Sequence, residues 1–155
     1  MCGIVGVASN LGVNNSLVNW AGEASEIISH RGPDDQGILL SENRKVCFAH
    51  RRLAIIDLSE SGHQPFESHS KRFSIVFNGE IYNHLQIRSK LQKNGFNKWV
   101  GNSDTETLLA SIEIFGLEKT LEYIIGMFSF AIFDKNENII HLVRDRTGEK
   151  PLFYT

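Results

Sequence analysis

A cysteine directly behind the initiator methionine is the residue of this sequence best placed to do chemistry. Removal of Met1 leaves Cys2 with its thiol and a free α-amino group on the same residue. An α-amine titrates near ~8, so it can act as a neutral base at physiological pH. A thiol beside such a base is an activated nucleophile of the N-terminal type. The alternative is an inert core thiol, because free cysteines are among the most buried residues.

The remaining cysteine and the histidines offer less. Cys47 lies inside an apolar run and is expected to be a core thiol. A cysteine–histidine dyad with His30 or His50 is the weaker alternative for Cys2, because a nucleophile that carries its own amine does not need an imidazole. No histidine pairs with another histidine or cysteine at zinc-ligand spacing, so we expect no metal site.

Two interpretations are open for Asn78-Gly79, which follows a β-rich run. Asn-Gly between two strand-like segments is the standard signal of a hairpin turn. The same pair can form an oxyanion hole, with the side-chain amide of Asn78 and the backbone N–H of Gly79 as donors. Acyl transfer needs donors of this kind, and losing one typically costs ~10²–10³ in rate. The local sequence does not choose between the two.

Arg52 and Asp104 are candidates for binding the two charged groups of an amino-acid substrate. The guanidinium of Arg52 can hold a carboxylate through two hydrogen bonds. Seen alone, however, Arg51-Arg52 at a strand end is more typical of a solvated basic pair. Asp104 can hold an ammonium, but any acid in the first turn of a helix also gains from the helix dipole. Together the two side chains would supply one anion site and one cation site.

The elements that must carry these residues are predicted from hydrophobic periodicity and turn residues. Helices are expected at 17–28, 84–93, 103–116 and 117–124. Strand-like segments are expected at 2–8, 37–40, 46–50, 53–56, 73–77, 127–133, 139–143 and 151–154. Strand pairs separated by helix pairs indicate an α+β fold with sheets packed between helices.

Two of these elements are specified in more detail. Ser103 is the expected N-cap of its helix, with Glu106 three residues later in a capping-box pattern and Gly116 as the stop. The segment 127–133 is apolar on both faces of the strand pattern, so both of its faces should be covered.

Composition excludes several classes of function. The 155 residues carry a net charge of −2 without a basic cluster, which argues against nucleic acid or an anionic membrane as the main partner. Neither a signal peptide nor an apolar run of about 20 residues occurs. Two cysteines suggest free thiols in a reducing cytoplasm. No glycine-rich phosphate motif is present, so we expect no nucleotide site in this chain.

Several strings in the sequence resemble class II glutamine amidotransferases, and they follow one another in order over nearly the whole chain. They are CGIVG at 2–6, HRGPDDQG at 30–37, HRRLAIIDLS at 50–59, GHQPF at 62–66, FNGEIYNH at 77–84, SDTE at 103–106, GMFSFAIFD at 126–134 and RDRTGEKPLFY at 144–154. Within that class, Pro-Asp-Asp after HRG, Phe77 before Asn78 and the KPLFY ending favour the glutaminase domain of glutamine-hydrolysing asparagine synthetases.

The resemblance implies an Ntn-hydrolase fold, a four-layer αββα sandwich of two antiparallel sheets between helices. It implies that Cys2 attacks the side-chain amide of L-glutamine to give a glutamyl thioester and ammonia. Asn78 and Gly79 match the oxyanion hole, Arg52 the ligand of the glutamine carboxylate, and Asp104 that of its ammonium. The pocket also includes Glu80 and a wall made of Leu53, Ala54, Ile55 and Ile56. The resemblance assigns no role to Arg31.

The resemblance also implies a partner. In such enzymes a C-terminal synthetase domain uses ATP and Mg to activate aspartate and receives the ammonia. We therefore expect residues 1–155 to be an N-terminal glutaminase domain, truncated at its C-terminal end, without a cofactor of its own, and able to form a homodimer. Three alternatives stay open: amidation of another acceptor such as a surface-sugar carboxylate, a non-catalytic module of the same fold, and an Ntn hydrolase acting on another amide.

Overall fold

The computed structural model describes residues 2–155, which form seven strands, four α-helices and two short 3₁₀ turns. The strands are β1 (Gly3–Ala8), β2 (Asp35–Leu40), β3 (Val46–Arg52), β4 (Phe66–Glu67), β5 (Phe73–Ile81), β6 (Gly126–Asp134) and β7 (Ile139–Arg144). The helices are α1 (Asn15–Ile27), α2 (His84–Lys93), α3 (Asp104–Phe115) and α4 (Leu117–Tyr123). The 3₁₀ turns are η1 (Ser29–Arg31) and η2 (Glu60–Gly62).

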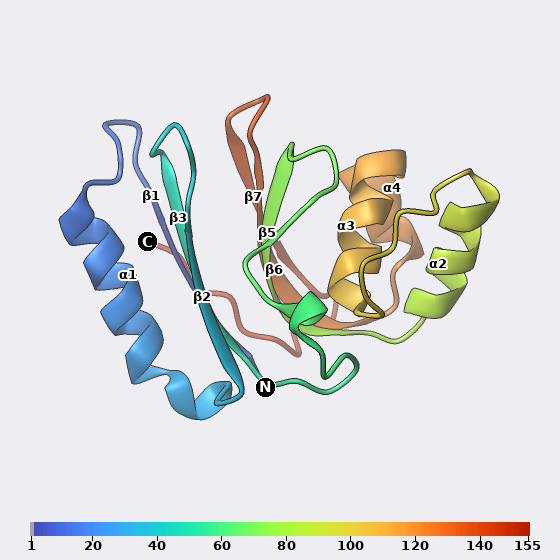
Figure 1. The fold of residues 1–155 in the computed structure, drawn as a ribbon, viewed down its shortest axis with the longest axis horizontal. Coiled ribbons are helices and arrows are strands. Elements are labelled where there is room, and N and C mark those ends of the chain that lie inside the picture. The colour runs from blue at the N-terminus through green and yellow to red at the C-terminus, as the bar shows by residue number, and fades with distance from the viewer. Residues whose placement is uncertain (1) are drawn as a thin grey trace.

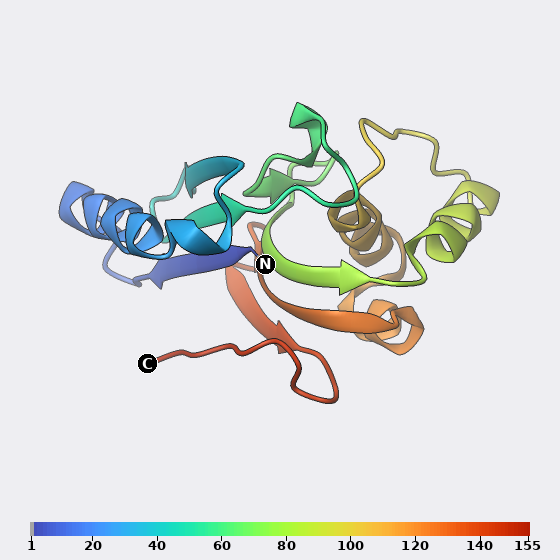
Figure 2. The ribbon, with the colours of Figure 1, turned by 90° about the horizontal axis from the view of Figure 1, so that it is seen from below.

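Two antiparallel sheets face each other between layers of helices (Figures 1 and 2). One sheet has the strand order β1-β3-β2, and the other has the order β4-β5-β6-β7. Helix α1 packs on the outer side of β1 and β3, whereas α3 packs on β4 and β5 and is itself flanked by α2 and α4. The expected α+β sandwich of two antiparallel sheets between helices is therefore present.

Strand β6 shows why the two sheets stack. Phe128, Phe130 and Ile132 belong to the core between the four-stranded sheet and its helices. Ala131 and Phe133 point the opposite way and pack with residues of the three-stranded sheet. The expectation that this segment is covered on both faces is confirmed. An apolar strand of this kind is stable only between two layers, because both of its faces lose water on packing.

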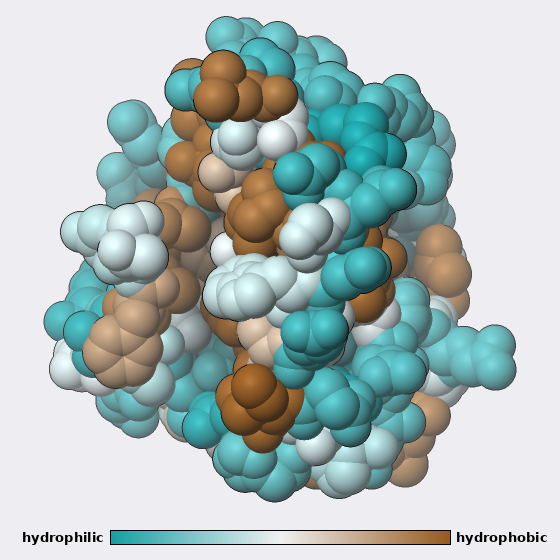
Figure 3. Space-filling model, turned by 90° about the vertical axis from the view of Figure 1, so that its left-hand side faces the viewer, coloured by the Kyte–Doolittle hydropathy of each residue, from teal (hydrophilic) through white to brown (hydrophobic). Residues whose placement is uncertain are grey.

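Helix α1 closes the outer side of the three-stranded sheet with a small core that includes Cys47 and Ala49 of β3. Cys47 is fully buried, as expected of a core thiol. Toward solvent, Figure 3 shows hydrophobic surface interrupted by polar residues on this side of the molecule. Scattered apolar side chains of this kind are ordinary on a protein surface. Within residues 2–155, each helix is too short or too polar to cross a membrane.

Of the two hydrogen bonds of the capping box predicted at the start of α3, only one is present. The hydroxyl of Ser103 accepts a hydrogen bond from the N–H of Glu106, which is the expected N-cap. The carboxylate of Glu106 does not return to Ser103. It accepts instead from the backbone N–H groups of Val100 and Gly101, at 2.7 and 3.0 Å. The acid thus orders the loop that leads into the helix.

The hairpin interpretation of Asn78-Gly79 is wrong, because β5 continues through both residues to Ile81. The pairing of β5 with β6 is unbroken from Phe73 to Ile81. The glycine serves a close approach: a Cβ at position 79 would overlap with the backbone of Met127 and Phe128 on β6.

Two expected strands are absent from the described chain. Residues 53–56 form a bent loop, and their apolar character belongs to a partly exposed wall: Ile55 is 62% exposed. Residues 151–155 have no ladder partner, and Phe153 and Tyr154 are 91% and 82% exposed. Apolar runs this short fit a strand or an irregular segment equally well, so composition alone misassigned both.

Candidate active site

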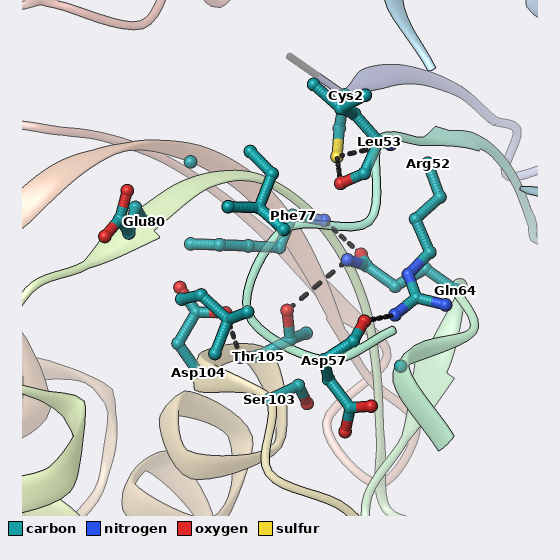
Figure 4. Close-up of a pocket in the computed structure, with 14 residues that line it drawn as sticks. Cys2, Arg52, Leu53, Asp57, Gln64, Phe77, Glu80, Ser103, Asp104 and Thr105 are labelled. Carbon is teal, nitrogen blue, oxygen red and sulfur yellow. Dashed lines mark hydrogen bonds between the residues drawn. The ribbon is translucent and has the colours of Figure 1, made fainter. Parts of the chain in front are cut away.

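One pocket gathers most of the residues singled out in the sequence (Figure 4). It lies where β1, the end of β3, β5 and the first turn of α3 meet. The predicted residues that line it are Cys2, Arg52, Leu53, Ile55, Ile56, Gly79, Glu80 and Asp104. Two predicted residues, Ala54 and Asn78, are not among those that line it. The N–H of Ala54 donates to the carboxylate of Asp34 at 2.8 Å, which fixes the wall from behind.

The thiol of Cys2 is held by backbone groups. The N–H of Leu53 donates to its sulfur at 3.4 Å, and the carbonyl oxygen of Leu53 lies 3.8 Å from the same sulfur. Burial raises the pKa of the Cys2 thiol, so a base has to remove its proton before attack. Both hydrogen-bond partners of the sulfur in the described chain are on Leu53, which leaves a dyad with His30 or His50 without support. Met1, whose removal would supply the amine, lies outside the described residues.

Alternation along β5 points backbone donors at the pocket. All of these residues have a partner on β6, but the backbone groups alternate in direction: the N–H groups of Val76, Asn78 and Glu80 face β6, whereas those of Phe77, Gly79 and Ile81 face the opposite edge of β5. Two of these N–H groups are already occupied: that of Phe77 donates to Gln64 at 2.7 Å and that of Ile81 to Asp104 at 2.9 Å. The N–H of Gly79 donates to no side chain within residues 2–155, and Gly79 lines the pocket.

The side chain of Asn78 points to the face of β5 opposite to that of Phe77. This side chain is buried, and its Oδ1 has no hydrogen-bond partner within residues 2–155. A buried amide without a partner is costly in an ordinary core. It lies between Phe77 and Gly79, which both line the pocket. Because Oδ1 only accepts, the donor that this side chain can offer to a ligand is its Nδ2 group.

Arg52 is buried, with 8% of its surface exposed, which excludes the solvated pair considered for Arg51-Arg52. Arg51 points to α1 and pairs with Glu26. Arg52 points the other way, and its guanidinium donates to the carbonyl oxygens of Asp57 and Ser59, the latter at 2.9 Å. A guanidinium has five N–H donors, so these two contacts hold it in place and leave donors for a carboxylate.

Asp104 lies across the pocket from Arg52 (Figure 4). Its carboxylate accepts from the N–H groups of Ile81 and Thr105, both at 2.9 Å. Burial raises the pKa of Asp104, and those two hydrogen bonds act in the opposite direction. Glu80 lines the same side of the pocket. An ammonium group placed here would meet two carboxylates, whereas a carboxylate would be repelled.

Sequence reasoning missed Gln64, which braces the floor of the pocket. Its side-chain oxygen accepts from the N–H of Phe77, and its amide nitrogen donates to the hydroxyl of Thr105 at 3.4 Å. Gln64 therefore links β5 to the first turn of α3. The only signal was the string GHQPF, where a polar residue stands in a loop with nothing local to mark it as buried.

Asp57 was also missed, and it fastens the pocket wall to the loop before α3. Its carboxylate accepts from the N–H and hydroxyl of Ser59, from the hydroxyl of Ser61 and from the N–H of Asn102. The hydrogen bond from the Ser59 hydroxyl is the largest influence, and together these bonds lower the pKa of Asp57 to about 2. Asp57 is therefore ionised at neutral pH and holds two loops together.

The arrangement as a whole fits nucleophilic attack on a small amino-acid derivative. The pocket is lined by a thiol, a backbone N–H, a guanidinium and two carboxylates, and the amide of Asn78 lies between two of its lining residues. Such a set can bind both charged groups of an amino acid and stabilise an oxyanion. Within the described part of the chain, no three histidine, cysteine or acidic side chains come together as metal ligands.

Comparison with known sequences agrees with this chemistry. The profile of the family described as "Glutamine amidotransferase domain" matches residues 1–155. Asparagine synthetase [glutamine-hydrolyzing] 1 of Bacillus subtilis (strain 168) is 39% identical over the whole chain, which spans 24% of that protein. Amidase chry2 of Gibberella zeae is 37% identical over the whole chain, which again spans 24% of it. The chain thus covers about a quarter of the length of these relatives.

Comparison with solved structures concerns the fold alone. The glutamine phosphoribosylpyrophosphate amidotransferase from B. subtilis superposes with a TM-score of 0.67 over 85% of this chain and 35% of the other, at 20% identity. The expected Ntn-hydrolase sandwich is confirmed by this match and by the two stacked antiparallel sheets.

Proposed function

Because the chain belongs to the glutamine amidotransferase domain family, we propose that it hydrolyses L-glutamine to glutamate and ammonia through a thioester on Cys2. Once Met1 is removed, the α-amine of Cys2 accepts the thiol proton. The sulfur then attacks the side-chain amide carbon of glutamine, and the carbonyl oxygen becomes an oxyanion. The protonated α-amine of Cys2 then returns the proton to the nitrogen of the glutamine side-chain amide, the C–N bond breaks, and ammonia leaves. Water then hydrolyses the thioester to glutamate and restores the thiol.

The observation that carries this proposal is the position of Gly79. Its N–H faces the pocket that Cys2 lines. The two N–H groups on either side of it along the same edge of β5 donate to the side chains of Gln64 and Asp104. The Nδ2 amide group of Asn78 is the proposed second donor, and the buried Oδ1 of the same side chain has no partner within residues 2–155 that would fix the amide in another orientation. Donors held by a strand need no reorganisation as the oxyanion forms, which is the main source of rate in acyl transfer.

Substrate selection follows from the charges around the pocket. Arg52 binds the α-carboxylate of glutamine, and Asp104 with Glu80 binds the α-ammonium. Leu53, Ile55 and Ile56 form the apolar wall beside the methylene groups, with Ala54 as its anchored backbone. Both charged groups are thus paired in the pocket, so an amide without an amino-acid head should bind poorly.

The test is glutamate release from glutamine by the processed protein. We expect release to be abolished in Cys2→Ala and blocked by a glutamine analogue that alkylates the thiol. Release that persists in Cys2→Ala would rule out this nucleophile. A correctly processed protein that releases no glutamate, even with a synthetase domain supplied, would favour a non-catalytic module. An unchanged KM for glutamine in Arg52→Ala would favour an Ntn hydrolase of another amide.

We further propose that the ammonia is used by a synthetase domain that activates aspartate with ATP and Mg. The support is that asparagine synthetases are among the relatives and are several times longer than this chain. The proposed glutaminase itself requires no cofactor, because every step uses groups of Cys2, its neighbours and water. A cytoplasmic location and a homodimer belong to the same proposal.

A second acceptor class has its own support. Two of the relatives are named amidases, chry2 and chyE, at 37% identity to this chain. A segment similar to this chain therefore also occurs in proteins that are not named asparagine synthetase. Amidation of a different carboxylate is the alternative to aspartate. Ammonia transfer measured with aspartate and with competing carboxylates, in the presence of ATP, separates the two.

A further inference from the structure

His50 is a buried titratable residue that the proposed mechanism does not use. It lies on β3, opposite Ile4 of β1 in the ladder, and it has no exposed surface. Its ring points away from α1 and toward the other sheet, where Nε2 lies 3.0 Å from the carbonyl oxygen of Phe77 on β5. No other hydrogen bond in the described chain joins a strand of one sheet to a strand of the other.

The partner determines the state of the ring. A carbonyl oxygen only accepts, so the hydrogen must sit on Nε2. Burial lowers the pKa of His50 to about 4, which keeps the ring neutral at physiological pH. Nδ1 is then the unprotonated nitrogen, and it has no partner within residues 2–155. A neutral ring with its hydrogen pointed at a carbonyl is arranged as a fixed donor, and within residues 2–155 it makes no hydrogen bond with the Cys2 sulfur.

The carbonyl that His50 holds belongs to the peptide between Phe77 and Asn78. The N–H of Phe77 is held as well, by the side chain of Gln64 at 2.7 Å. Both backbone groups of Phe77 are thus fixed by buried side chains from outside β5. The next two residues are Asn78 and Gly79, the proposed oxyanion donors. Gln64 therefore holds the peptide before Phe77 and His50 the peptide after it, and together they set the direction in which Asn78 and Gly79 follow.

We propose that His50 is a positioning residue that fixes the oxyanion donors of β5 relative to the nucleophile on the three-stranded sheet. The same strand, β3, is paired with β1 next to Cys2 and carries Arg52. The hydrogen bond from His50 to Phe77 fixes the position of β5, in the second sheet, relative to β3 and Cys2. The inference rests on the proposed glutaminase function and adds to it a role for a residue that touches neither the substrate nor the thiol.

The consequence is a selective loss of rate. Without the His50 donor, the Phe77 carbonyl is left buried and unpaired, and the peptide between Phe77 and Asn78 is held only on its β6 side. Binding of the glutamine head group by Arg52 and Asp104 is not affected. We expect kcat to fall about ten- to hundred-fold, less than or comparable to the loss of one oxyanion donor, with KM changed by less than about three-fold.

The experiment compares four variants in the full chain. His50→Gln keeps a donor near the position of Nε2. His50→Leu removes the donor, and His50→Asn keeps a polar side chain that is too short to reach Phe77. Phe48→Leu is the matched control, because Phe48 is buried on the same face of β3 but packs only in the apolar core. Each variant is measured for cooperative thermal unfolding, for kcat and KM with glutamine, and for alkylation of Cys2 by iodoacetamide.

Iodoacetamide separates thiol position from oxyanion stabilisation, since displacement of iodide at a saturated carbon builds no oxyanion. We expect kcat to fall in His50→Leu and His50→Asn while their alkylation rate stays near that of the wild type. We expect His50→Gln to keep most of the wild-type kcat. Phe48→Leu should unfold at a lower temperature with kcat unchanged.

Two results overturn the inference while leaving the function intact: an active wild type with unchanged kcat in His50→Leu and His50→Asn, or a loss in His50→Gln as large as in His50→Leu. If His50→Leu does not unfold cooperatively, His50→Asn decides in its place. A processed wild type whose Cys2 is alkylated but which releases no glutamate, even with a synthetase domain supplied, overturns the proposed function, and the inference with it.

Discussion

The side chain of Arg31 donates from Nε to the backbone carbonyl of Cys2, at 3.2 Å. Arg31 is in η1, directly after α1, and the sequence alone assigned it no role. The contact ties the first described residue of the chain to a structured turn. A chain terminus is ordinarily the least ordered part of a domain, so a nucleophile at that position needs such an anchor.

Arg31→Ala should therefore lower kcat/KM for glutamine by about ten-fold, since a hydrogen bond to a charged donor is worth roughly 1.5–3 kcal/mol when buried and this one is partly exposed. Steady-state glutaminase kinetics provide the measurement. Arg44→Ala is the control, because Arg44 makes a similar guanidinium–carbonyl contact, to Val13, away from the pocket. Equal kinetics for Arg31→Ala and wild type would show that the anchor has no part in catalysis.

Arg52→Lys should raise the KM for glutamine about ten-fold or more, because a lysine cannot form the paired contact with a carboxylate. The same change also disturbs the loop that Arg52 holds through Asp57 and Ser59. Asp57→Asn is the matched control, since it loosens that loop and leaves the guanidinium in place. If both variants raise KM equally, Arg52 acts on the loop and not on the substrate.

Asp104→Asn should weaken recognition of the α-ammonium group while keeping an acceptor for the N–H of Ile81. Wild type should prefer glutamine to an analogue that lacks the α-amino group. In Asp104→Asn this preference should shrink by about ten-fold, because one of two carboxylates facing the ammonium is neutral. The measurement is the ratio of kcat/KM for the two substrates, and an undiminished ratio in the variant would exclude this role of Asp104.

Acid should destabilise the fold through His50. Burial lowers the pKa of His50 from its ordinary value near 6.5 to about 4. Between these values the unfolded chain binds a proton that the folded chain does not, so stability falls as the pH falls through this window. The full effect is about 3 kcal/mol. His50→Gln does not titrate, so the difference in urea-unfolding free energy between wild type and variant should shift by that amount. A difference that is constant with pH would contradict this.

Much of the fold was predictable because it rests on local signals. The helix at 84–93 and the N-cap at Ser103 were predicted correctly from spacing and turn residues, and the apolar strand at 127–133 was recognised as covered on both faces. The helix and the strand rest on the regular periodicity of side chains along an element, and the N-cap rests on the type of the residue that precedes a helix. Pocket residues such as Cys2 and Asp104 were identified by type and motif, and the fold brings them together.

The rest depends on contacts between segments far apart in the chain. Asn78-Gly79 has the composition of a turn, but pairing with β6 keeps it extended, and nothing near it in the sequence shows that partner. Gln64 and Asp57 are polar loop residues whose partners come from β5 and from the loop before α3. A one-dimensional pattern records neither burial nor partner for such residues, so it could not show that they hold the pocket together.

The central claim is that Cys2, as the N-terminal residue, forms a covalent glutamyl intermediate. The direct test is mass spectrometry of the protein quenched with acid during turnover of glutamine, followed by mapping of the N-terminal peptide. The account predicts a peptide that begins at Cys2 and carries one glutamyl group, and no such adduct in Cys2→Ala. An active protein that retains Met1, or a glutamyl group on any other residue, would contradict it.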